Sequence, residues 1–288
     1  MTPAILANAA PLLARYETVF CDVWGVLHNG QAAYHEAGEV LARFRASGGT
    51  VILVSNAPVP AEGVVRVLDR TGVRRDAWDA IVSSGDIALV HIAEKGYRHL
   101  HRIGPARRDS MLFKRLPGES VSLDLADAIV CTGLVDDGNE TVATYHPLID
   151  DGVARKLPFV CANPDLVVDV GHKRYLCAGS IAAEYEARGG DVFWAGKPHH
   201  SAYAAAFLKA AELRGARPDA ARVLAIGDAV RTDLAAAAGA GVDALFIASG
   251  IHNDEVLTAG EVDAGKLAAL FAPPGTPPAV GAMTRLRW

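Results

Sequence analysis

Short runs of apolar residues recur along the chain, and each ends abruptly at a polar residue. Such runs occupy residues 18–21, 50–54, 223–226 and 244–248. Continuous apolar runs of this length are typical of strands that are buried on both faces of a parallel sheet. Apolar residues at helical spacing predict helices between the runs, over residues 36–46, 61–70 and 201–214. Strand–helix alternation of this kind predicts a doubly wound α/β sheet.

The middle third of the chain carries a second strand–helix series. Its apolar runs lie at residues 80–84, 128–131 and 159–161, with a helical pattern over 87–94. We therefore predict a core domain made of residues 1–80 and 192–272, interrupted by an inserted α/β domain over residues 81–191. Four prolines between residues 273 and 278 exclude a helix or a central strand there, so residues 273–288 are predicted to form an extended, Pro-rich tail.

Composition and charge narrow the class of protein. The chain has 288 residues, of which 51% are hydrophobic, enough to bury a large core. Its formal charge is -5 and no basic run stands out, which argues against a nucleic-acid partner. No segment approaches the roughly 18 apolar residues that span a bilayer, and no basic residue precedes Arg15, as a signal peptide would require. We expect a cytoplasmic protein without a membrane partner.

The cysteines give no sign of a metal site. None of the four forms a C-x-x-C pair, and each lies in or beside an apolar stretch: Cys21, Cys131, Cys161 and Cys177. We expect reduced, buried thiols. Disulfides in an exported protein are the alternative, which the absence of an export signal disfavours.

Polar side chains follow three of the predicted strands. These positions hold Asp22, Ser55 with Asn56, and Asp228, and Asp233 follows five residues after Asp228. Ligands collect at the carboxyl ends of the strands in open α/β sheets. Carboxylates grouped there repel one another unless a cation joins them, and such hard oxygen ligands suit Mg²⁺. A lysine before the predicted helix at 201–214, Lys197, would add positive charge, and a phosphate dianion fits what remains.

Taken in order, these segments resemble the four motifs of the haloacid dehalogenase (HAD) superfamily of aspartate-nucleophile hydrolases. The matching segments are residues 22–27, residues 55–56, Lys197, and residues 227–233. The insert, with its segments 162–165 and 177–181, resembles the cap of subclass IIA, which includes nitrophenylphosphatase-like and pyridoxal-phosphate-phosphatase-like enzymes. The resemblance implies a Rossmann-like core carrying an inserted cap domain.

The resemblance also implies catalytic roles. Asp22 would attack phosphorus and form an aspartyl-phosphate, which divides a difficult displacement into two easier steps. Ser55 and the backbone N–H of Asn56 would bind phosphoryl oxygens. Lys197 would neutralise charge on both Asp22 and the phosphate.

The implied metal site takes its ligands from both halves of the core. Mg²⁺ would be held by the carboxylates of Asp22 and Asp228, by the backbone carbonyl of Trp24, and by Asp233, directly or through water. In the family's phosphatases, however, the position of Trp24 holds a second Asp that protonates the leaving group and then activates water. An indole N–H only donates hydrogen bonds, and general acid–base catalysis is worth about 10²–10⁴-fold.

Several of these residues also have simpler structural interpretations. Lys197 fits an ordinary surface lysine, and the sequence Asn-Pro-Asp forms a good turn in any protein, so a substrate-binding role for Asn163 and Asp165 rests on the resemblance. Residues 172–174 of the insert are basic and fit either an anion-binding loop or a solvated one. His28 and His199 lie near the motifs as replacements for the missing acid, although structural roles are the simpler interpretation.

The sequence thus favours a Mg²⁺-dependent phosphoric monoester hydrolase acting on a small phosphorylated metabolite. A phosphometabolite-binding or regulatory protein is the alternative, because Trp24 replaces the acid–base residue. Dehalogenation at carbon also uses an Asp nucleophile but needs no Mg²⁺, so Asp228 and Asp233 disfavour it. Substrate identity and oligomeric state stay open, a homodimer through the caps or the sheet edges being one arrangement that the sequence allows.

Overall fold

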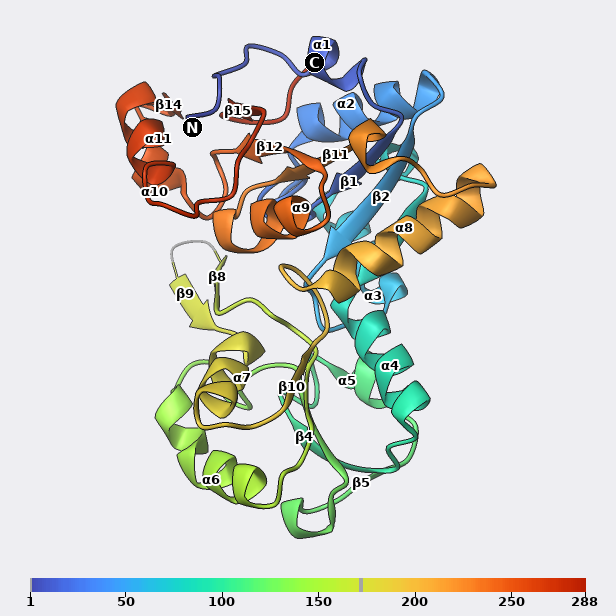
Figure 1. Ribbon diagram of the computed structural model, residues 1–288, viewed down its shortest axis with the longest axis vertical. Coiled ribbons are helices and arrows are strands. Elements are labelled where there is room, and N and C mark those ends of the chain that lie inside the picture. Colours follow the sequence, from blue (N-terminus) through green and yellow to red (C-terminus); the bar gives the residue numbers. More distant parts are fainter. Residues whose placement is uncertain (1, 171–172) are drawn as a thin grey trace. The chain divides into compact units, whose positions relative to one another are not determined.

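The computed structural model describes residues 2–170 and 173–288 (Figure 1). The chain divides into two compact units. The first comprises Met1–Ser55, Val65–Val82 and Ala202–Trp288, and the second comprises Asn56–Val64 and Ser83–Ser201. The second unit is therefore an insertion into the first, as predicted for an α/β core with an inserted domain.

The first unit contains a six-stranded sheet in the order β15-β12-β11-β1-β2-β3. Its strands are β1 (Thr18–Cys21), β2 (Thr50–Ser55), β3 (Ala80–Ser83), β11 (Val223–Gly227), β12 (Asp243–Ile247) and β15 (Gly281–Met283). The pairings from β15 to β2 are parallel, with Cys21 opposite both Ile226 of β11 and Leu53 of β2. Every residue of the three central strands is buried, because helices cover both faces of the sheet.

Helices and short segments of the first unit connect these strands. They are α1 (Ala10–Leu13), α2 (His35–Ala46), α3 (Ala61–Thr71), whose first turn belongs to the second unit, α8 (His200–Arg214), α9 (Ala235–Gly239), α10 (Asn253–Val256) and α11 (Ala264–Leu270), with the hairpin β13 (Leu257–Thr258) and β14 (Glu261–Val262). Helix α2 shows why the sequence folds this way. Val40, Leu41 and Phe44 form its buried stripe, while Arg43 and Arg45 lie in its last turn, where cations favour the helix dipole.

The second unit has its own five-stranded parallel sheet, in the order β10-β7-β6-β4-β5. Its strands are β4 (His99–Ile103), β5 (Glu119–Ser120), β6 (Ala128–Cys131), β7 (Phe159–Cys161) and β10 (Val192–Trp194), beside a hairpin of β8 (Val167–Val170) and β9 (Lys173–Leu176). Its helices are α4 (Ser84–Lys95), α5 (Ser110–Phe113), α6 (His146–Ala154) and α7 (Ala178–Ala187).

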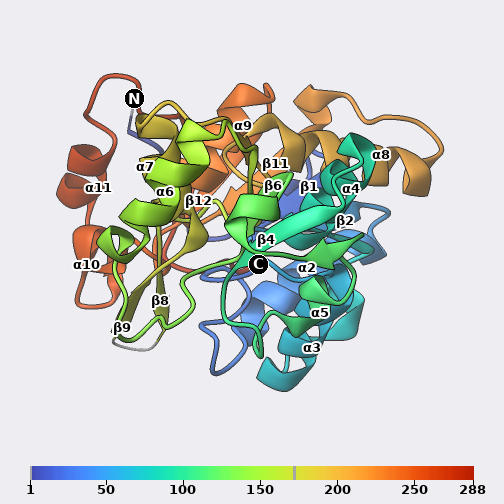
Figure 2. The same cartoon turned by 90° about the horizontal axis from the view of Figure 1, so that it is seen from below.

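Alternate residues of the second sheet face two separate cores. Ile129 and Phe159 pack with Ile149 of α6 and Ile181 of α7. Their strand neighbours, such as Val130, pack on the other face with residues of α4 and α5. Figures 1 and 2 show α6 and α7 on one side of this sheet and α4 and α5 on the other. The second unit is thus a doubly wound sheet in its own right.

The structure differs from the sequence prediction at three element assignments. Strand β3, predicted to begin the inserted domain, is the edge strand of the first sheet beside β2. Strand β10, predicted to lie in the core, pairs with β7 in the second sheet. Residues 281–283 of the predicted tail form β15, which pairs with β12. A short apolar run is equally suited to either sheet, and its partner depends on tertiary contacts.

The four cysteines are buried free thiols, as their apolar surroundings predicted. Burial is the main reason that the pKa values of the Cys131 and Cys177 thiols rise to about 12. Within the described ranges, no helix has the length and apolar character that crossing a membrane would require.

Candidate active site

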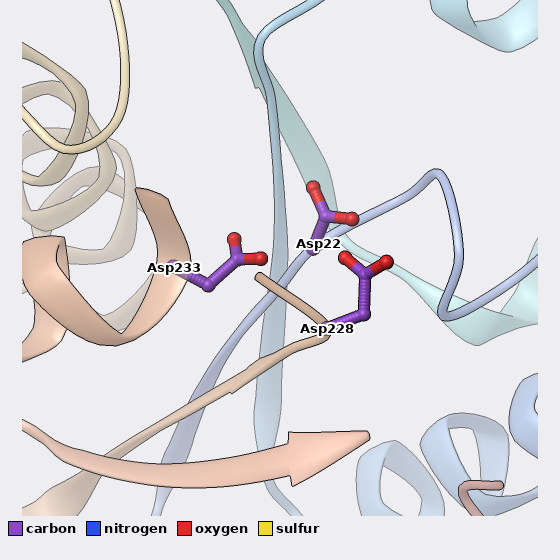
Figure 3. Close-up of side chains that lie close together, drawn as sticks. All are labelled: Asp22, Asp228 and Asp233. Atoms are coloured by element: carbon purple, nitrogen blue, oxygen red, sulfur yellow. The ribbon is translucent and has the colours of Figure 1, made fainter. Parts of the chain in front are cut away.

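Three aspartates meet at the carboxyl edge of the first sheet. Asp22 follows β1, Asp228 follows β11, and Asp233 lies in a π-helical turn, η5 (Val230–Leu234). One oxygen of each carboxylate lies within 4.8 Å of those of the other two, and Figure 3 shows the side chains converging. The parallel register of β1 and β11 causes this meeting, since both strands end at the same level and deliver the residues that follow them to one place.

Backbone N–H groups hold the carboxylates of Asp228 and Asp233 in place. The N–H of Ile251 donates to Oδ2 of Asp228 at 2.7 Å, and the N–H of Ala229 donates to Oδ2 of Asp233 at 3.0 Å. Both carboxylates are buried. Gly25 makes room for one of them, because a Cβ on it would lie 2.2 Å from Oδ2 of Asp228. Its φ of +85° also lies in the left-handed region that favours glycine.

The three carboxylates fit a divalent cation. They supply hard, anionic oxygen atoms close enough for one ion to contact all of them. In the part of the chain that the structure describes, this is the one cluster of three His, Cys, Asp or Glu side chains with such spacing. Asp228 and Asp233 are buried and Asp22 is half-buried, so water screens the repulsion between their charges poorly. Asp22, Asp228 and Asp233 would therefore hold the metal that the sequence predicted.

Trp24 belongs to a tight turn that follows Asp22. Its ring meets the His28 ring edge to face, with centroids 5.1 Å apart and an interplanar angle of 76°. The N–H of Gly25 donates to the carbonyl of His28 at 2.9 Å. A Cβ on Gly30, whose φ is +85°, would lie 2.3 Å from Cη2 of Trp24. The turn is therefore shaped around the indole ring.

His28 supports this turn from inside. The imidazole is 1% exposed, and its Nδ1 accepts the N–H of Gly30 at 2.9 Å. Burial, with a smaller contribution from the charge of Arg70, lowers the pKa of His28 to about 4. The ring is therefore neutral at pH 7, and it stabilises the turn through its contacts with Gly30 and Trp24. This agrees with the structural interpretation of this histidine.

Three further predicted residues of the second unit, Asn163, Asp165 and Lys197, lie around Asn56. Its Oδ1 accepts the N–H of Lys197 at 2.9 Å, and its Nδ2 donates to the carbonyl of Lys197 at 2.9 Å. The same Nδ2 donates to Oδ1 of Asp165 at 2.9 Å. Asn163 forms a turn in which its Oδ1 accepts the N–H of Asp165 at 3.1 Å. Lys197, at 2% exposure, is not an ordinary surface lysine.

The structure thus distributes the predicted residues over both units. Ser55 ends β2 in the first unit, with the three aspartates and Trp24, whereas Asn56 begins the second. The two hydrogen bonds between the Asn56 amide and the Lys197 backbone, the Asn56 bracket, were not predicted from the sequence. The only sequence feature that points to them is the Ser-Asn pair that follows a predicted strand. His199, considered as a substitute acid, stacks on Trp194 with ring centroids 4.8 Å apart. Of the basic segment at 172–174, His172 lies outside the described residues.

Sequence reasoning also missed a feature of the first unit near α2. Two adjoining cavities, each of about 290 Å³, share Glu36 and Arg285 in their walls. The guanidinium of Arg285 lies over the ring of Tyr34, 4.9 Å from its centroid. Burial raises the pKa of Tyr34, which the charge of Arg285 opposes and that of Asp228 reinforces. Tyr34 is therefore an electrostatic neighbour of the aspartate cluster that no sequence motif indicated.

Two family models match separate segments of the chain. Residues 19–113 match the family model described as haloacid dehalogenase-like hydrolase, and residues 194–269 match a model described as HAD-hydrolase-like. A search of curated proteins found no match.

Solved structures resemble the whole chain. A hydrolase of the haloacid dehalogenase-like family from Brucella suis 1330 shares 39% identity, with 98% of this chain and 100% of that chain covered and a TM-score of 0.85. The 4-nitrophenylphosphatase of Thermotoga maritima shares 20% identity, with 95% and 96% covered and a TM-score of 0.68. NagD from E. coli K-12 shares 20% identity, with 94% and 96% covered and a TM-score of 0.65. The Thermotoga maritima and E. coli proteins have the same fold as this chain.

Proposed function

This chain belongs to the haloacid dehalogenase-like hydrolase family, and we propose that it is a Mg²⁺-dependent phosphatase of a small phosphorylated metabolite. The observation that carries the proposal is the convergence of Asp22, Asp228 and Asp233 within 4.8 Å at the carboxyl edge of the first sheet. The 4-nitrophenylphosphatase of Thermotoga maritima, which has the same fold, supports phosphate ester hydrolysis as the reaction.

In the proposed reaction, a carboxylate oxygen of Asp22 attacks phosphorus. A bond forms between Asp22 and phosphorus, and the bond from phosphorus to the leaving oxygen breaks, with its electron pair going to that oxygen. Water then attacks the aspartyl-phosphate, which releases phosphate and restores the Asp22 carboxylate. Both displacements need the charge on the phosphoryl oxygens to be offset.

The surrounding residues would offset the negative charge on the phosphoryl oxygens. Ser55 and the backbone N–H of Asn56 would bind phosphoryl oxygens, and the ammonium of Lys197 would balance the charge of Asp22 and the phosphate. Held by the three aspartates and the Trp24 carbonyl, Mg²⁺ would supply the positive charge that lets a dianion approach a carboxylate. In the second unit, the Asn56 bracket fixes the Lys197 backbone and brings Asp165 beside it, where Asp165 and Asn163 would contact the substrate.

The buried free thiols support a reducing, cytoplasmic location. The proposed partner is the phosphorylated metabolite itself, with neither nucleic acid nor membrane involved. A homodimer remains compatible with the proposal, which does not depend on it.

The test is phosphate release from a panel of phosphomonoesters in the presence of Mg²⁺. The wild type is expected to release phosphate, and Asp22→Asn is expected to fall to background. As a control matched in net charge, Asp69→Asn changes an exposed carboxylate paired with Arg75 and should leave the rate unchanged. Equal rates for Asp22→Asn and the wild type would refute the proposal.

Trp24 favours a second candidate, a phosphometabolite-binding protein that no longer turns over. This candidate predicts Mg²⁺-dependent binding of a phosphate mimic such as fluoroberyllate at Asp22, without release of phosphate from any ester in the panel. Turnover by the wild type that depends on Asp22 would exclude it.

A further inference from the structure

The position beside the nucleophile holds a side chain that cannot supply a proton. Trp24 lies two residues after Asp22, and its indole has no acid–base chemistry near neutral pH. The ring is also fixed by its surroundings, since it packs edge to face with His28 and leaves no space for a Cβ on Gly30. A proton for the leaving group must therefore come from elsewhere or be unnecessary.

Four neighbouring side chains of the first unit, those of His28, Tyr34, Asp228 and Asp233, do not supply this proton. The Nδ1 of His28 accepts a backbone N–H, which places the proton of the neutral ring on Nε2, a buried atom without a hydrogen-bond partner among the described residues, in an imidazole that is 1% exposed. Tyr34 lies beneath the Arg285 guanidinium, and a phenol releases its proton only near pH 10. Asp228 and Asp233 accept backbone N–H groups and, as metal ligands, would be anionic. These groups, drawn from the described part of the first unit, do not replace an acid.

Without the acid that this position supplies in the family's phosphatases, the identity of the leaving oxygen decides the rate. An alcohol leaves as an alkoxide, whose conjugate acid is about as weak an acid as water and far weaker than a phenol. A phenol ionises near pKa 10 and a carboxylic acid near pKa 4. Departure of an alkoxide therefore depends on the missing proton, which is worth about 10²–10⁴-fold in rate. Departure of a phenolate or a carboxylate does not depend on it.

We propose, building on the function proposed above, that the substrates carry phosphate on an acidic oxygen: aryl phosphates, enol phosphates or acyl phosphates, rather than alkyl phosphates. Asp22 forms its bond to phosphorus, the bond to the leaving oxygen breaks, and the electron pair departs on a phenolate, enolate or carboxylate. That anion needs no proton in the transition state and equilibrates with water after release. The chemistry balances without a further reactant.

The second step carries an independent signature. Asp22 itself leaves as a carboxylate when water attacks the aspartyl-phosphate, so this step needs no acid. It does need water to lose a proton, and Trp24 cannot accept one. We therefore expect the second step to be slow and the aspartyl-phosphate to accumulate, with a burst of one leaving group per enzyme molecule.

The experiment compares kcat/KM across ring-substituted phenyl phosphates, acetyl phosphate and an alkyl phosphate, all with Mg²⁺. The wild type should show a steep dependence on leaving-group acidity, together with the burst and a phosphorylated enzyme detected by intact mass. Trp24→Asp should raise kcat/KM for the alkyl phosphate by about 10²–10⁴-fold and for nitrophenyl phosphate by less than about 10-fold. As a matched control, Trp288→Asp at a half-exposed tryptophan should reproduce the wild-type dependence.

The outcomes separate this inference from the function on which it rests. If alkyl and aryl phosphates react at similar rates, with Asp22→Asn inactive, the protein is a phosphatase but the leaving-group inference is wrong. If no ester releases phosphate and acetyl phosphate leaves no phosphoenzyme, the proposed function itself fails. Because the wild-type series and the burst need no variant, poor folding of Trp24→Asp would not prevent either conclusion.

Discussion

Neutralising one aspartate of the cluster should stabilise the protein in the absence of metal. The change is Asp233→Asn, which keeps an oxygen to accept the N–H of Ala229 but removes one of three neighbouring negative charges. The ligand oxygens lie within 4.8 Å of one another, and two unit charges at that upper limit repel by about 0.9 kcal/mol at a dielectric constant of 80 and by about 3.5 kcal/mol at 20. The variant loses two of the three repulsions, so the free energy of unfolding should rise by about 2–7 kcal/mol.

Thermal unfolding in a chelating buffer measures this effect. At about 2–4 °C per kcal/mol for a domain of this size, the Tm of Asp233→Asn should exceed that of the wild type by at least about 4 °C. Titration with Mg²⁺ should then raise the Tm of the wild type. At a free Mg²⁺ concentration of a hundred times Kd, the free energy of unfolding should increase by about 2.7 kcal/mol. The variant should gain less, because it has lost a ligand.

The control is Asp69→Asn, which changes the net charge equally at an exposed pair with Arg75. Its stability should change by no more than about 1 kcal/mol, since exposed ion pairs contribute little. A Tm of Asp233→Asn at or below the wild-type value in chelator would refute the argument from crowded carboxylates. An equal gain in Asp69→Asn would attribute the effect to net charge alone.

Three further predictions concern the supporting residues. Gly30→Ala should lower the free energy of unfolding by at least about 1–2 kcal/mol, measured by denaturant titration, and by less in a Trp24→Ala background that removes the clash. The pKa of His28 falls from 6.5 to about 4 on folding, so the unfolded chain binds more protons in that window; stability should fall by about 3 kcal/mol from pH 7 to pH 4, and His28→Gln should abolish this component. Asn56→Ala should lower the free energy of unfolding by about 1–3 kcal/mol through the lost hydrogen bonds to the Lys197 backbone and speed hydrogen exchange at the Lys197 amide, whereas unchanged exchange would contradict the bracket.

The sequence predicted the central elements because their patterns depend on local physics. Residues 18–21 and 223–226 are apolar throughout, and such runs must be buried on both faces wherever they pair. The polar residue after each run then lies at the sheet edge, which is why Asp22 and Asp228 were predicted to meet. The peripheral elements β3, β10 and β15 were assigned differently because their partners are distant in sequence.

The site was predictable in its residue types but not in its supporting contacts. Asp233 was placed near Asp228 by spacing alone, and the structure brings both beside Asp22. The Asn56 amide bracket on Lys197 joins residues 141 positions apart, and no local pattern indicates such a pair. The same holds for the fit of Trp24 to Gly30, which depends on a backbone conformation with positive φ.

The interleaved order of the two sheets has a consequence for synthesis on the ribosome. The first sheet places β11 against β1, and the chain reaches β11 only after the whole second unit has been made. The second sheet is built from one continuous stretch of residues, 99–194, so its strands can pair while the C-terminal strands are still to be translated. Until then, one edge of β1 lacks its native neighbour, and Asp22 stands apart from Asp228 and Asp233. The inserted unit is therefore expected to fold first, with the metal site assembled last.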